Sequence, residues 1–499
     1  MSNSSSNNAS EHQTLARGGL VVFIASIADR FLRLIGTWIL STALGPSAFG
    51  SYTFAIAVVT LASIFAPLGT EVGAIYFGAR FRQAQDKNKL KGLIVSGTIL
   101  TALSGAAAAL GLYGFAPVLF DDPEPIRCIA PAIVFWAPLY YVVGLLRAVK
   151  DMRSNALVYQ LGLSSFLAIG AVFVWGAGPT VQLALNVYIV ALALALPLGW
   201  LRAWKHYGDL LKDKTIQSTY SLKELLTYSV PQALSSMVAQ LNLWMDILMM
   251  GYLTSDAEIG TYKIVAAVVS ICGLPVTALI TIFNPIIAEK VESKALEALN
   301  ELLKRVTKWV LTISTPLLMI LFLLPKWALS VFDDAYLGGA LILQVLILGR
   351  FVMVSSAMAM RLIPMSGHPM LNLINGIVAA LLNIILNWFL IPKYGGLGAA
   401  IATSTTIVLW SLWRLVEVWI LLRCFPFSKK SLGLLAASIG ISIVLFSYLQ
   451  DKTEPVRLGI SIMSVLCFCL VSIKWGMDKE DHILLNPIRK KLRQFSRSR

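Results

Sequence analysis

Residues 32–58 read LRLIGTWILSTALGPSAFGSYTFAIAV, and this stretch holds the end of one long apolar run and the start of the next. The same character continues along all 499 residues, of which 57% are hydrophobic and 13% are charged. A soluble protein has roughly 25% charged residues. The mean hydropathy is +0.75 because apolar residues fill whole segments rather than one face of each. These properties indicate a membrane protein.

Apolar runs of about 20 residues recur through the chain, which is the length at which a helix crosses a bilayer core of ~30 Å. Membrane-spanning segments must satisfy their own backbone hydrogen bonds, so they are helices or strands of a closed barrel. These runs lack the alternation of apolar and polar residues that barrel strands show. The sequence therefore predicts an all-α polytopic membrane protein with about fourteen transmembrane helices. We expect these helices at 19–43, 50–69, 92–117, 128–147, 157–176, 180–201, 225–250, 259–284, 307–332, 340–361, 370–391, 396–420, 432–449 and 456–475.

The distribution of lysine and arginine predicts the orientation in the membrane. The loops form two alternating sets, and one set holds most of the 41 basic residues, including Lys87 and the basic segment 477–499. The opposite set contains acidic clusters such as DDPEP at 121–125. Because cytoplasmic loops carry an excess of Lys and Arg, we expect both termini in the cytoplasm. The formal charge of +15 then reflects orientation and does not indicate a nucleic-acid partner.

The opening stretch contains a pattern that returns later in the chain. LGPSAFGSYTFAIAVV (44–59) matches LTSDAEIGTYKIVAAVV (253–269), and their Gly-x-Tyr motifs begin at Gly50 and Gly260. An even number of predicted spans separates the copies, so both have the same orientation. Parallel repeats of this kind occur in transporters whose substrate site lies between the two halves. The alternative is that Gly-x-Tyr recurs by chance in a glycine-rich chain.

The repeat predicts how the chain is divided. We expect a polar cytoplasmic tail, two six-helix lobes around a central cavity, two extra C-terminal helices and a basic cytoplasmic tail. These regions are residues 1–18, 19–217 and 218–425 for the two lobes, 426–476 and 477–499.

Polar residues inside two of the predicted spans lie on one helical face. Ionisable side chains inside a membrane cost about 2.5–3.5 kcal/mol each, so they usually face a protein interior or water. In the first and seventh spans the polar positions follow one another at steps of three and four residues, which places them on one face. We therefore predict that both faces line a central cleft. The expected cavity-lining polar residues are Ser26, Thr37, Gln232, Ser236 and Asn242.

Three intramembrane arginines are candidate ligands for an anionic head group. Arg30 has no obvious partner on its own helix, and Arg350 has no acid nearby in the sequence. Arg33 can pair with Asp29, four residues earlier, and the alternative reading of that pair is a neutral structural one. A guanidinium stays charged, and its planar fork suits phosphate. The sequence thus predicts an anion site formed by Arg30, Arg33 and Arg350.

Acids in or near the spans are candidates for coupling transport to an ion. A carboxylate in a partly dry cleft can carry a proton or hold a cation. Asp246 in the seventh span is the strongest candidate, whereas Glu71 has an alternative explanation as a solvated residue near a helix end. The predicted coupling or gating residues are Asp246, Glu71, Asp29 and Lys263. Arg414 and Glu417, three residues apart, are expected to neutralise each other.

Enzyme signatures are missing from the sequence. It has no HExxH zinc motif, no GxSxG nucleophile elbow and no Walker loop. The four histidines lie in predicted tails or loops. We therefore expect no catalytic residue, no metal and no cofactor.

Three segments resemble a known family. They are LRLIGTWILSTALGPSAFGSYTFAIAV (32–58), MGYLTSDAEIGTYKIVAA (250–267) and LLNIILNWFLIPKYGGLGAAIAT (381–403). They resemble the oligosaccharide flippases of bacterial polysaccharide biosynthesis, the O-antigen (Wzx-type) exporters of the multidrug/oligosaccharidyl-lipid/polysaccharide (MOP) superfamily. The resemblance implies alternating access between two lobes. It also implies that a glycan on undecaprenyl pyrophosphate is moved to the outer leaflet of the bacterial cytoplasmic (inner) membrane, for lipopolysaccharide or another surface polysaccharide.

The resemblance also implies partners. These are the lipid-linked oligosaccharide, membrane lipids, a coupling proton or Na⁺, and glycan polymerase or assembly proteins. An alternative on the same scaffold is a multidrug/cation antiporter, whose cleft should be lined by carboxylates and aromatic rings. A membrane glycan polymerase or acyltransferase is a further alternative, but it would need a long outer loop or an intramembrane histidine.

Overall fold

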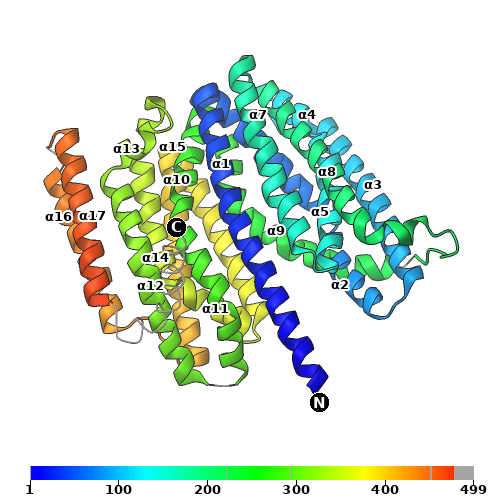
Figure 1. Ribbon diagram of the computed structural model, residues 1–499. Coiled ribbons are helices and arrows are strands. Elements are labelled where there is room, and N and C mark those ends of the chain that lie inside the picture. Colours follow the sequence, from blue (N-terminus) through cyan, green and yellow to red (C-terminus); the bar gives the residue numbers. More distant parts are fainter. Residues whose placement is uncertain (1, 221, 294, 450–451, 477–499) are drawn as a thin grey trace, which may run out of the picture. The chain divides into compact units, whose positions relative to one another are not determined.

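The computed structural model describes residues 2–220, 222–293, 295–449 and 452–476, and nearly all of these residues are helical (Figure 1). Every predicted span overlaps one or two helices, which confirms the all-α polytopic fold. The chain forms two compact units. Unit 1 contains the chain up to Ile264 together with Ile384–Gly396, and unit 2 contains Val265–Asn383 and the chain from Leu397 onward.

The helices of unit 1 follow the first six predicted spans, the seventh, and the start of the eighth. They are α1 (Ser2–Phe65), α2 (Thr70–Gln83), α3 (Lys87–Leu119), α4 (Glu124–Ile129), α5 (Ala132–Ala148), α6 (Met152–Asn155), the π-helix η1 (Ala156–Gly162), α7 (Leu163–Ala177), α8 (Val181–Lys212), α9 (Leu222–Leu253) and the first part of α10 (Asp256–Ile271).

Helix α5 forms the centre of unit 1. Its sequence AIVFWAPLYYVVGLLRA is apolar on all sides, as expected for a helix surrounded by others. It packs against α2, α3 and α8. The buried hydroxyl of Tyr141 donates a hydrogen bond to the carbonyl of Leu93 at 2.7 Å. A Cβ at Gly97 would lie 2.1 Å from the Tyr141 ring, so glycine there lets α3 approach α5.

Backbone breaks separate the first two spans and end the second. Gly45 has φ 73° and ψ 171°, a conformation that requires glycine, and Pro46 follows it inside α1. The chain then turns at Leu68 and Gly69, both with positive φ, before α2 begins. The second predicted span therefore does not continue directly into α2, where Glu71 lies.

The helices of unit 2 follow the remaining predicted spans. They are the rest of α10, α11 (Leu274–Glu292), α12 (Leu296–Leu323), α13 (Pro325–Ser330), the 3₁₀ helix η2 (Asp334–Gly339), α14 (Ala340–Met365), α15 (Pro369–Leu422) outside Ile384–Gly396, α16 (Lys429–Leu449) and α17 (Glu454–Gly476). Helix α15 contains two predicted spans, and Gly395 (φ 54°, ψ −131°) breaks it between them.

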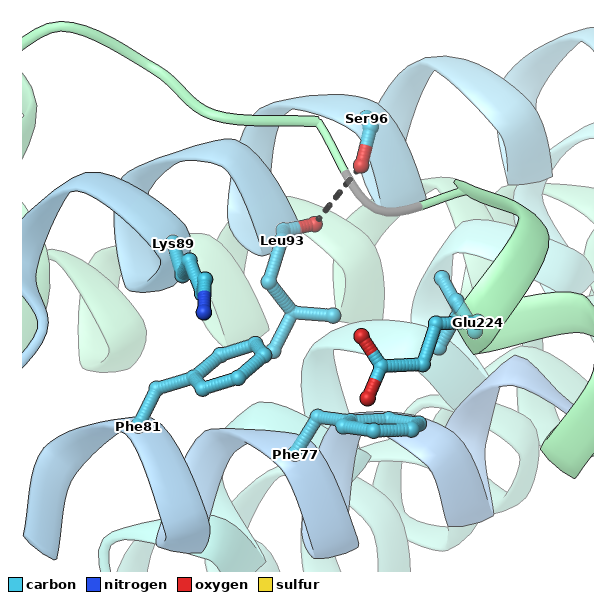
Figure 2. A pocket seen from close by; sticks show the side chains of 7 residues that line it. Phe77, Phe81, Lys89, Leu93, Ser96 and Glu224 are labelled. Carbon is cyan, nitrogen blue, oxygen red and sulfur yellow. Dashed lines mark hydrogen bonds between the residues drawn. The ribbon is translucent and has the colours of Figure 1, made fainter. Parts of the chain in front are cut away.

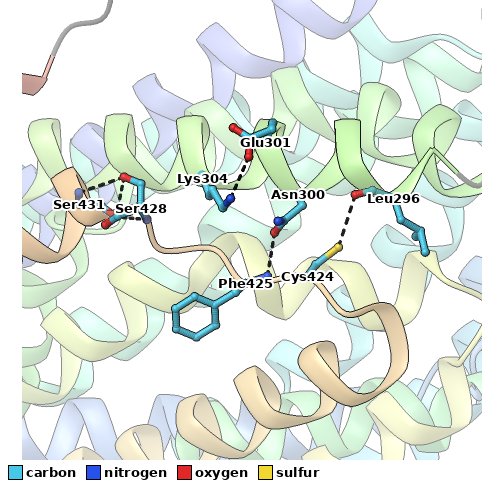
Figure 3. Close-up of polar contacts among 8 residues, drawn as sticks. All are labelled: Leu296, Asn300, Glu301, Lys304, Cys424, Phe425, Ser428 and Ser431. Atoms are coloured by element: carbon cyan, nitrogen blue, oxygen red, sulfur yellow. Dashed lines mark hydrogen bonds and ion pairs between the residues drawn. The ribbon is translucent and has the colours of Figure 1, made fainter.

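Helix α12 connects the elements of unit 2. It packs against α11, α14, α16 and α17. It also fixes the segment between α15 and α16, because the backbone N–H of Phe425 donates to Oδ1 of Asn300 at 2.8 Å (Figure 3). The Cys424 thiol contacts the carbonyl of Leu296 at 3.9 Å. The segment that leads into α16 is thus attached to α12, and α16 and α17 pack along α12.

Candidate functional site

The strongest polar group inside unit 1 is an ion pair on α1. Nε of Arg33 lies 2.8 Å from Oδ1 of Asp29, and the hydroxyl of Ser164 on α7 donates to the same oxygen. The Asp29 side chain is 18% exposed, whereas that of Arg33 is 45% exposed. The acid is therefore the more buried member of the pair. Within the described part of the chain the two terminal nitrogens of Arg33 have no hydrogen-bond partner, which leaves them available to an anion.

A π-helix brings two further polar side chains to this region. Helix η1 places Gln160 so that its amide donates to the Ser26 hydroxyl on α1 at 2.9 Å. The hydroxyl of its neighbour Tyr159 lies 3.1 Å from that of Tyr140 on α5. π-Helices are rare and frequently occur at functional sites. The one here aims two adjacent polar residues at different partners.

Aromatic rings form one wall beside Arg33. Trp136 packs edge-on against Tyr140, with the ring centres 5.0 Å apart, and its ring centre is 6.4 Å from those of Tyr159 and Tyr188. The charge of Arg33 interacts electrostatically with Tyr159 and Tyr188. The guanidinium and the tyrosine hydroxyls therefore lie in one neighbourhood, formed by α1, α5, η1 and α8.

Lys263 on α10 shares this neighbourhood. Its ammonium lies over the Trp244 ring, 4.3 Å from the ring centre, which is a cation–π contact. The positive charge of Arg33 acts on Lys263. Like charges inside a membrane protein are unfavourable unless an anion offsets them. The joint role of Lys263 and Arg33 stays a prediction.

Asp246 on α9 has a separate and well-defined set of partners. Its Oδ2 accepts a hydrogen bond from the Tyr262 hydroxyl at 2.6 Å, and its Oδ1 accepts one from the Asn387 amide at 2.8 Å. Tyr262 is the tyrosine of the second Gly-x-Tyr motif, so the repeat contributes directly to this cluster.

Glu71 lies apart from Asp246, at the start of α2. Nη1 of Arg147 at the end of α5 is 2.6 Å from its Oε1, and Nε of Arg147 donates to Asn155 at 3.3 Å. Burial raises the pKa of Glu71, although the charge of Arg147 acts to lower it. This pair links α2, α5 and α6 at the helix ends. Glu71 is therefore not simply solvated at a helix end, which was the alternative explanation of its position, because Arg147 contacts its carboxylate.

The remaining predicted site residues have other surroundings. Arg30 is exposed, and Thr37 is half-buried on the same helix. The exposed Asn242 donates to the carbonyl of Val238 in its own helix at 2.9 Å. Arg350 lies in unit 2, where Nη1 is 3.2 Å from the sulfur of Met353. The grouping of Arg350 with Arg30 and Arg33 stays a prediction, and Gln232 and Ser236 lie outside the residues whose side chains the structure describes.

The charge of Glu417 acts on Arg414, as their spacing suggested, but each side chain hydrogen-bonds to other residues. Arg414 donates to the Asn372 amide oxygen at 2.8 Å and to the Met360 carbonyl at 2.7 Å. Glu417 accepts instead from Asn375 at 2.6 Å and from Trp413 at 2.9 Å. The first half of α15 supplies two of these partners, which spacing along the second half alone could not reveal.

Several residues of the site were not predicted, although their spacing carried a signal. Gln160 and Ser164 are four residues apart in an otherwise apolar span and therefore share a helical face. Asn387 stands in LLNIILNWF, with Asn383 four residues before it. Tyr159 carried no such signal, because its role depends on the π-helix.

A small pocket lies elsewhere in unit 1, between α2, α3 and the start of α9 (Figure 2). The ammonium of Lys89 lies 5.9 Å from the centre of the Phe81 ring, and the carboxylate of Glu224 is 3.3 Å from Arg80. Its lining residues are Phe77, Phe81, Lys89, Leu93, Ser96, Glu224 and Leu225. It contains none of the predicted site residues, so we do not assign it to the site.

Comparison with known proteins gives a consistent set of relatives. The profile of the family described as "Polysaccharide biosynthesis protein" matches residues 15–291, and the MatE profile matches residues 231–389. The chain is 22% identical to the probable flippase AglR of Haloferax volcanii, over 90% of this chain and 93% of that protein. It is 23% identical to the uncharacterized membrane protein MJ1068 of Methanocaldococcus jannaschii, over 57% of this chain and 56% of that relative's length.

The fold is also similar to solved structures. A lipid II flippase, MurJ, in an inward closed conformation, superposes with a TM-score of 0.70 at 16% sequence identity. The similarity covers 90% of this chain and 98% of that one. At this level of identity the likeness shows a shared fold.

Proposed function

The chain belongs to the polysaccharide biosynthesis protein family and is a multi-pass membrane transporter of the MOP superfamily, and on this premise we propose that it flips a lipid-linked oligosaccharide. The proposed substrate is a glycan on undecaprenyl pyrophosphate, moved from the cytoplasmic to the outer leaflet. We further propose a cytoplasmic-membrane location with both termini in the cytoplasm, as the distribution of basic residues favours.

The observation that carries this proposal is the Arg33 guanidinium of unit 1, which Asp29 contacts through Nε. The charge of Arg33 also acts on Lys263, whose ammonium lies over the Trp244 ring. A pyrophosphate would offset this positive charge, and the second edge of the guanidinium suits its oxygens. An anionic head group that leaves a cell with a negative interior also gains about 2.3 kcal/mol per charge per 100 mV.

We propose a different role for Asp246. Its carboxylate is held by Tyr262 and Asn387, and it belongs to α9, in the second copy of the repeat. A carboxylate in a membrane span can take up a proton or hold a small cation, which is the property that ion coupling requires. Under this proposal Asp246 couples transport to a proton or Na⁺, while Arg33 and Lys263 bind the head group.

The test of the head-group site is a binding measurement on the purified full chain in detergent. We expect Arg33→Gln to weaken binding of undecaprenyl pyrophosphate by about 10- to 100-fold, because a hydrogen bond to a charged group contributes about 1.5–3 kcal/mol. Binding of undecaprenol, which has the same tail and no phosphate, should not change.

Two controls make the result specific. Arg153→Gln removes an exposed arginine on α6 and should leave binding unchanged. The double change Asp29→Asn with Arg33→Gln avoids the uncompensated carboxylate of the single variant, and it should bind as weakly as the single variant. Equal affinity of the native chain for undecaprenyl pyrophosphate and undecaprenol would overturn the proposed head-group site.

A second candidate function is a multidrug/cation antiporter, which the MatE match over residues 231–389 favours. That function would place a cationic substrate at the Asp246 carboxylate. Competition distinguishes the two: a lipophilic cation such as ethidium should displace neither undecaprenyl pyrophosphate nor its analogues if the flippase proposal is correct. Ethidium efflux that depends on Asp246 and not on Arg33 would favour the antiporter.

A further inference from the structure

The small pocket between α2, α3 and the start of α9 combines an apolar floor with opposite charges at its rim (Figure 2). Phe77, Phe81 and Leu225 are buried and give the pocket its apolar floor. Lys89 and Glu224 also line it, and their side chains are 46% and 49% exposed. In Figure 2 both charged groups point into the same space, with Lys89 above the Phe81 ring. The pocket therefore presents a cation and a carboxylate to one small space.

These two charged groups do not pair with each other in the described part of the chain. Nζ of Lys89 lies 3.6 Å from Oδ2 of Asp86, and Oε1 of Glu224 lies 3.3 Å from Nη1 of Arg80. Exposed ion pairs of this kind contribute little to stability and are weakened by salt. An ammonium has three donors and a carboxylate has two acceptor oxygens, so each group can bind a ligand while it keeps its present partner.

The segment between α8 and α9 fixes the shape of the pocket. The ammonium of Lys91 on α3 donates to the carbonyls of Asp213 and Ile216, at 2.6 and 3.2 Å. The backbone N–H of Thr219 donates to the carbonyl of Asn88 at 3.1 Å. Helix α9 thus follows a segment that is attached to the start of α3, the helix that carries the cation of the pocket. The two charged groups are positioned before a ligand arrives, which reduces the cost of binding.

Exposed apolar side chains continue from the pocket along α2 and α9. Tyr76 on α2 is 46% exposed, and Leu222 at the start of α9 is 39% exposed. The rings of Tyr76 and Tyr228 stack with their centres 4.5 Å apart, and Tyr228 packs edge-on against Phe77 of the pocket floor. A ligand with its polar head in the pocket would find apolar surface directly beside it. This arrangement favours an amphiphile over a soluble ion.

We propose that this pocket binds the phosphoethanolamine head group of a membrane phospholipid. Lys89 contacts the phosphate, and Glu224 contacts the ammonium, which a short ethylene spacer joins to the phosphate. A purely anionic head group would place its charge beside Glu224, and a purely cationic one would meet Lys89, so a head group with both charges fits best. The basic residues predict that this end of α3 faces the cytoplasm, which assigns the lipid to the cytoplasmic leaflet. The inference does not depend on the proposed flippase function.

Native mass spectrometry of the purified full chain in detergent measures the binding of each lipid. Phosphatidylethanolamine is compared with phosphatidylglycerol, which has the same phosphate and acyl chains but no ammonium, and we expect the parent to bind the former more tightly. Glu224→Gln should weaken phosphatidylethanolamine binding by about 10-fold and should not weaken phosphatidylglycerol binding, because only the ammonium contacts the carboxylate. Lys89→Gln should weaken the binding of both lipids by a similar factor, because both carry the phosphate.

The matched controls remove exposed charges outside the pocket. Lys223→Gln, next to Glu224 in the sequence, and Glu292→Gln at the end of α11 should leave the binding of both lipids unchanged. A parent chain without preference between the two lipids would overturn the proposal. So would a Glu224→Gln variant that keeps the full preference of the parent.

A soluble competitor distinguishes a lipid from a free phosphate ester. Phosphoethanolamine without acyl chains carries the same two charges, so it should displace the lipid only at a much higher concentration, because it lacks the contacts of the tail. Displacement by the free ester at the concentration of the lipid itself would assign the pocket to a soluble ester and overturn the lipid.

A second measurement uses the parent chain and applies if the variants do not fold. A phosphatidylethanolamine with a photoreactive diazirine at the start of one acyl chain is cross-linked to the full chain in nanodiscs, and the labelled peptides are identified. Labelling concentrated around Tyr76 and Leu222, and reduced by excess phosphatidylethanolamine but not by phosphatidylglycerol, supports the proposal. Equal labelling around Leu110 on α3, which is 73% exposed and does not line the pocket, overturns it.

Discussion

Asp29 determines how Arg33 is presented. It accepts hydrogen bonds from Nε of Arg33 and from the Ser164 hydroxyl, so two elements, α1 and α7, fix its position. The guanidinium is then held along one edge while its other edge points away from the acid. An arginine tethered in this way loses less rotational freedom on binding an anion than an untethered one would. The alternative of a purely structural pair does not account for the 45% exposure of the Arg33 side chain.

The role of Asp246 can be tested by an isosteric change. Asp246→Asn removes the titratable group and keeps the side-chain shape, so the pH or Na⁺ dependence of transport should become flat. The measurement is translocation of a lipid-linked glycan in proteoliposomes at several pH values and Na⁺ concentrations.

Tyr262→Phe is the matched control for that change. It removes one hydrogen bond of 2.6 Å to Asp246 but keeps the carboxylate, so the dependence should persist. A pH and Na⁺ dependence that survives in Asp246→Asn would exclude this residue from the coupling role.

Asp151 gives a pH prediction outside the membrane-spanning segments. It caps α6 by accepting from the Ser154 N–H at 3.0 Å, and His206 lies 2.7 Å away. Burial acts to raise the pKa of Asp151, but these hydrogen bonds outweigh it, and the pKa lies below its usual value. The stabilisation is therefore present above the unfolded pKa of about 3.9 and is lost as the pH falls through the lower folded value.

Asp151→Ala should accordingly reduce the free energy of unfolding by about 0.5–2 kcal/mol at pH 7, the usual effect of losing a helix N-cap. At pH 3 the difference from the parent should be smaller. Thermal unfolding in detergent at both pH values measures this. Arg153→Ala, an exposed neighbour in the same helix, should show no such pH dependence.

Residue-scale prediction succeeded where spacing along one helix was enough. The four-residue step from Asp29 to Arg33 predicted their pairing, which is confirmed at 2.8 Å. It failed where the partner comes from a distant segment, as with Asn387 and Asp246. No pattern along one helix encodes which neighbour will face it, because that depends on how the helices pack.

Two glycines divide long helices into separate spans. Gly45 in α1 and Gly395 in α15 have backbone angles that side chains with a Cβ adopt only under strain. Gly45→Ala and Gly395→Ala should each reduce the free energy of unfolding by about 1–3 kcal/mol, the cost of such a conformation. Thermal unfolding in detergent measures the change.

Gly114→Ala in α3 is the control for these variants. An added Cβ there meets no atom within 4 Å, and alanine favours a helix over glycine, so stability should stay the same or rise slightly. Equal stability of Gly45→Ala and the parent would contradict the strain assigned to the kink.

At the scale of elements, hydropathy predicted where helices run but not how they are interrupted. Each predicted span overlaps at least one helix because a run of about 20 apolar residues marks it, but the span predicted at 259–284 is divided between α10 and α11. The turn at 66–69 and the π-helix at 156–162 were not predicted. Both change the helical geometry over only a few residues. Hydropathy averaged over about 20 residues does not detect so local a change.

The topology of the whole chain has a direct test. Lys87 begins α3 and Asp122 follows its end, so the two lie at opposite ends of one predicted span. An impermeant thiol reagent added outside intact cells should label Asp122→Cys and not Lys87→Cys. Labelling of Lys87→Cys should require permeabilised cells. Labelling of both from one side would contradict the predicted orientation.

The whole-molecule prediction was strongest for the repeat and weakest for the site. Matching motifs predicted that the regions around Gly50 and Gly260 are equivalent. In agreement with this, Gly50 packs against the carbonyl oxygen of Asp256, and Gly260 packs against that of Pro46, the equivalent residue. The boundaries at 217 and 425 between the lobes stay predictions. Contact within the chain instead groups α9 and Ile384–Gly396 with the first helices, since packing does not follow the repeat boundaries.

The π-helix Ala156–Gly162 gives its helix an unusual mechanical property. Its hydrogen bonds skip one more residue than those of an α-helix, so the segment stores one surplus residue. If that surplus moves along the helix, the part it crosses turns by about 100°, the angle of one α-helical residue. Tyr159 and Gln160 lie inside the segment, whereas Ser164 lies beyond it. A shift of one residue would therefore rotate the side chains of Tyr159 and Gln160 about the helix axis, while Ser164 keeps its hydrogen bond to Asp29. The connections of this helix to the rest of the chain would not change.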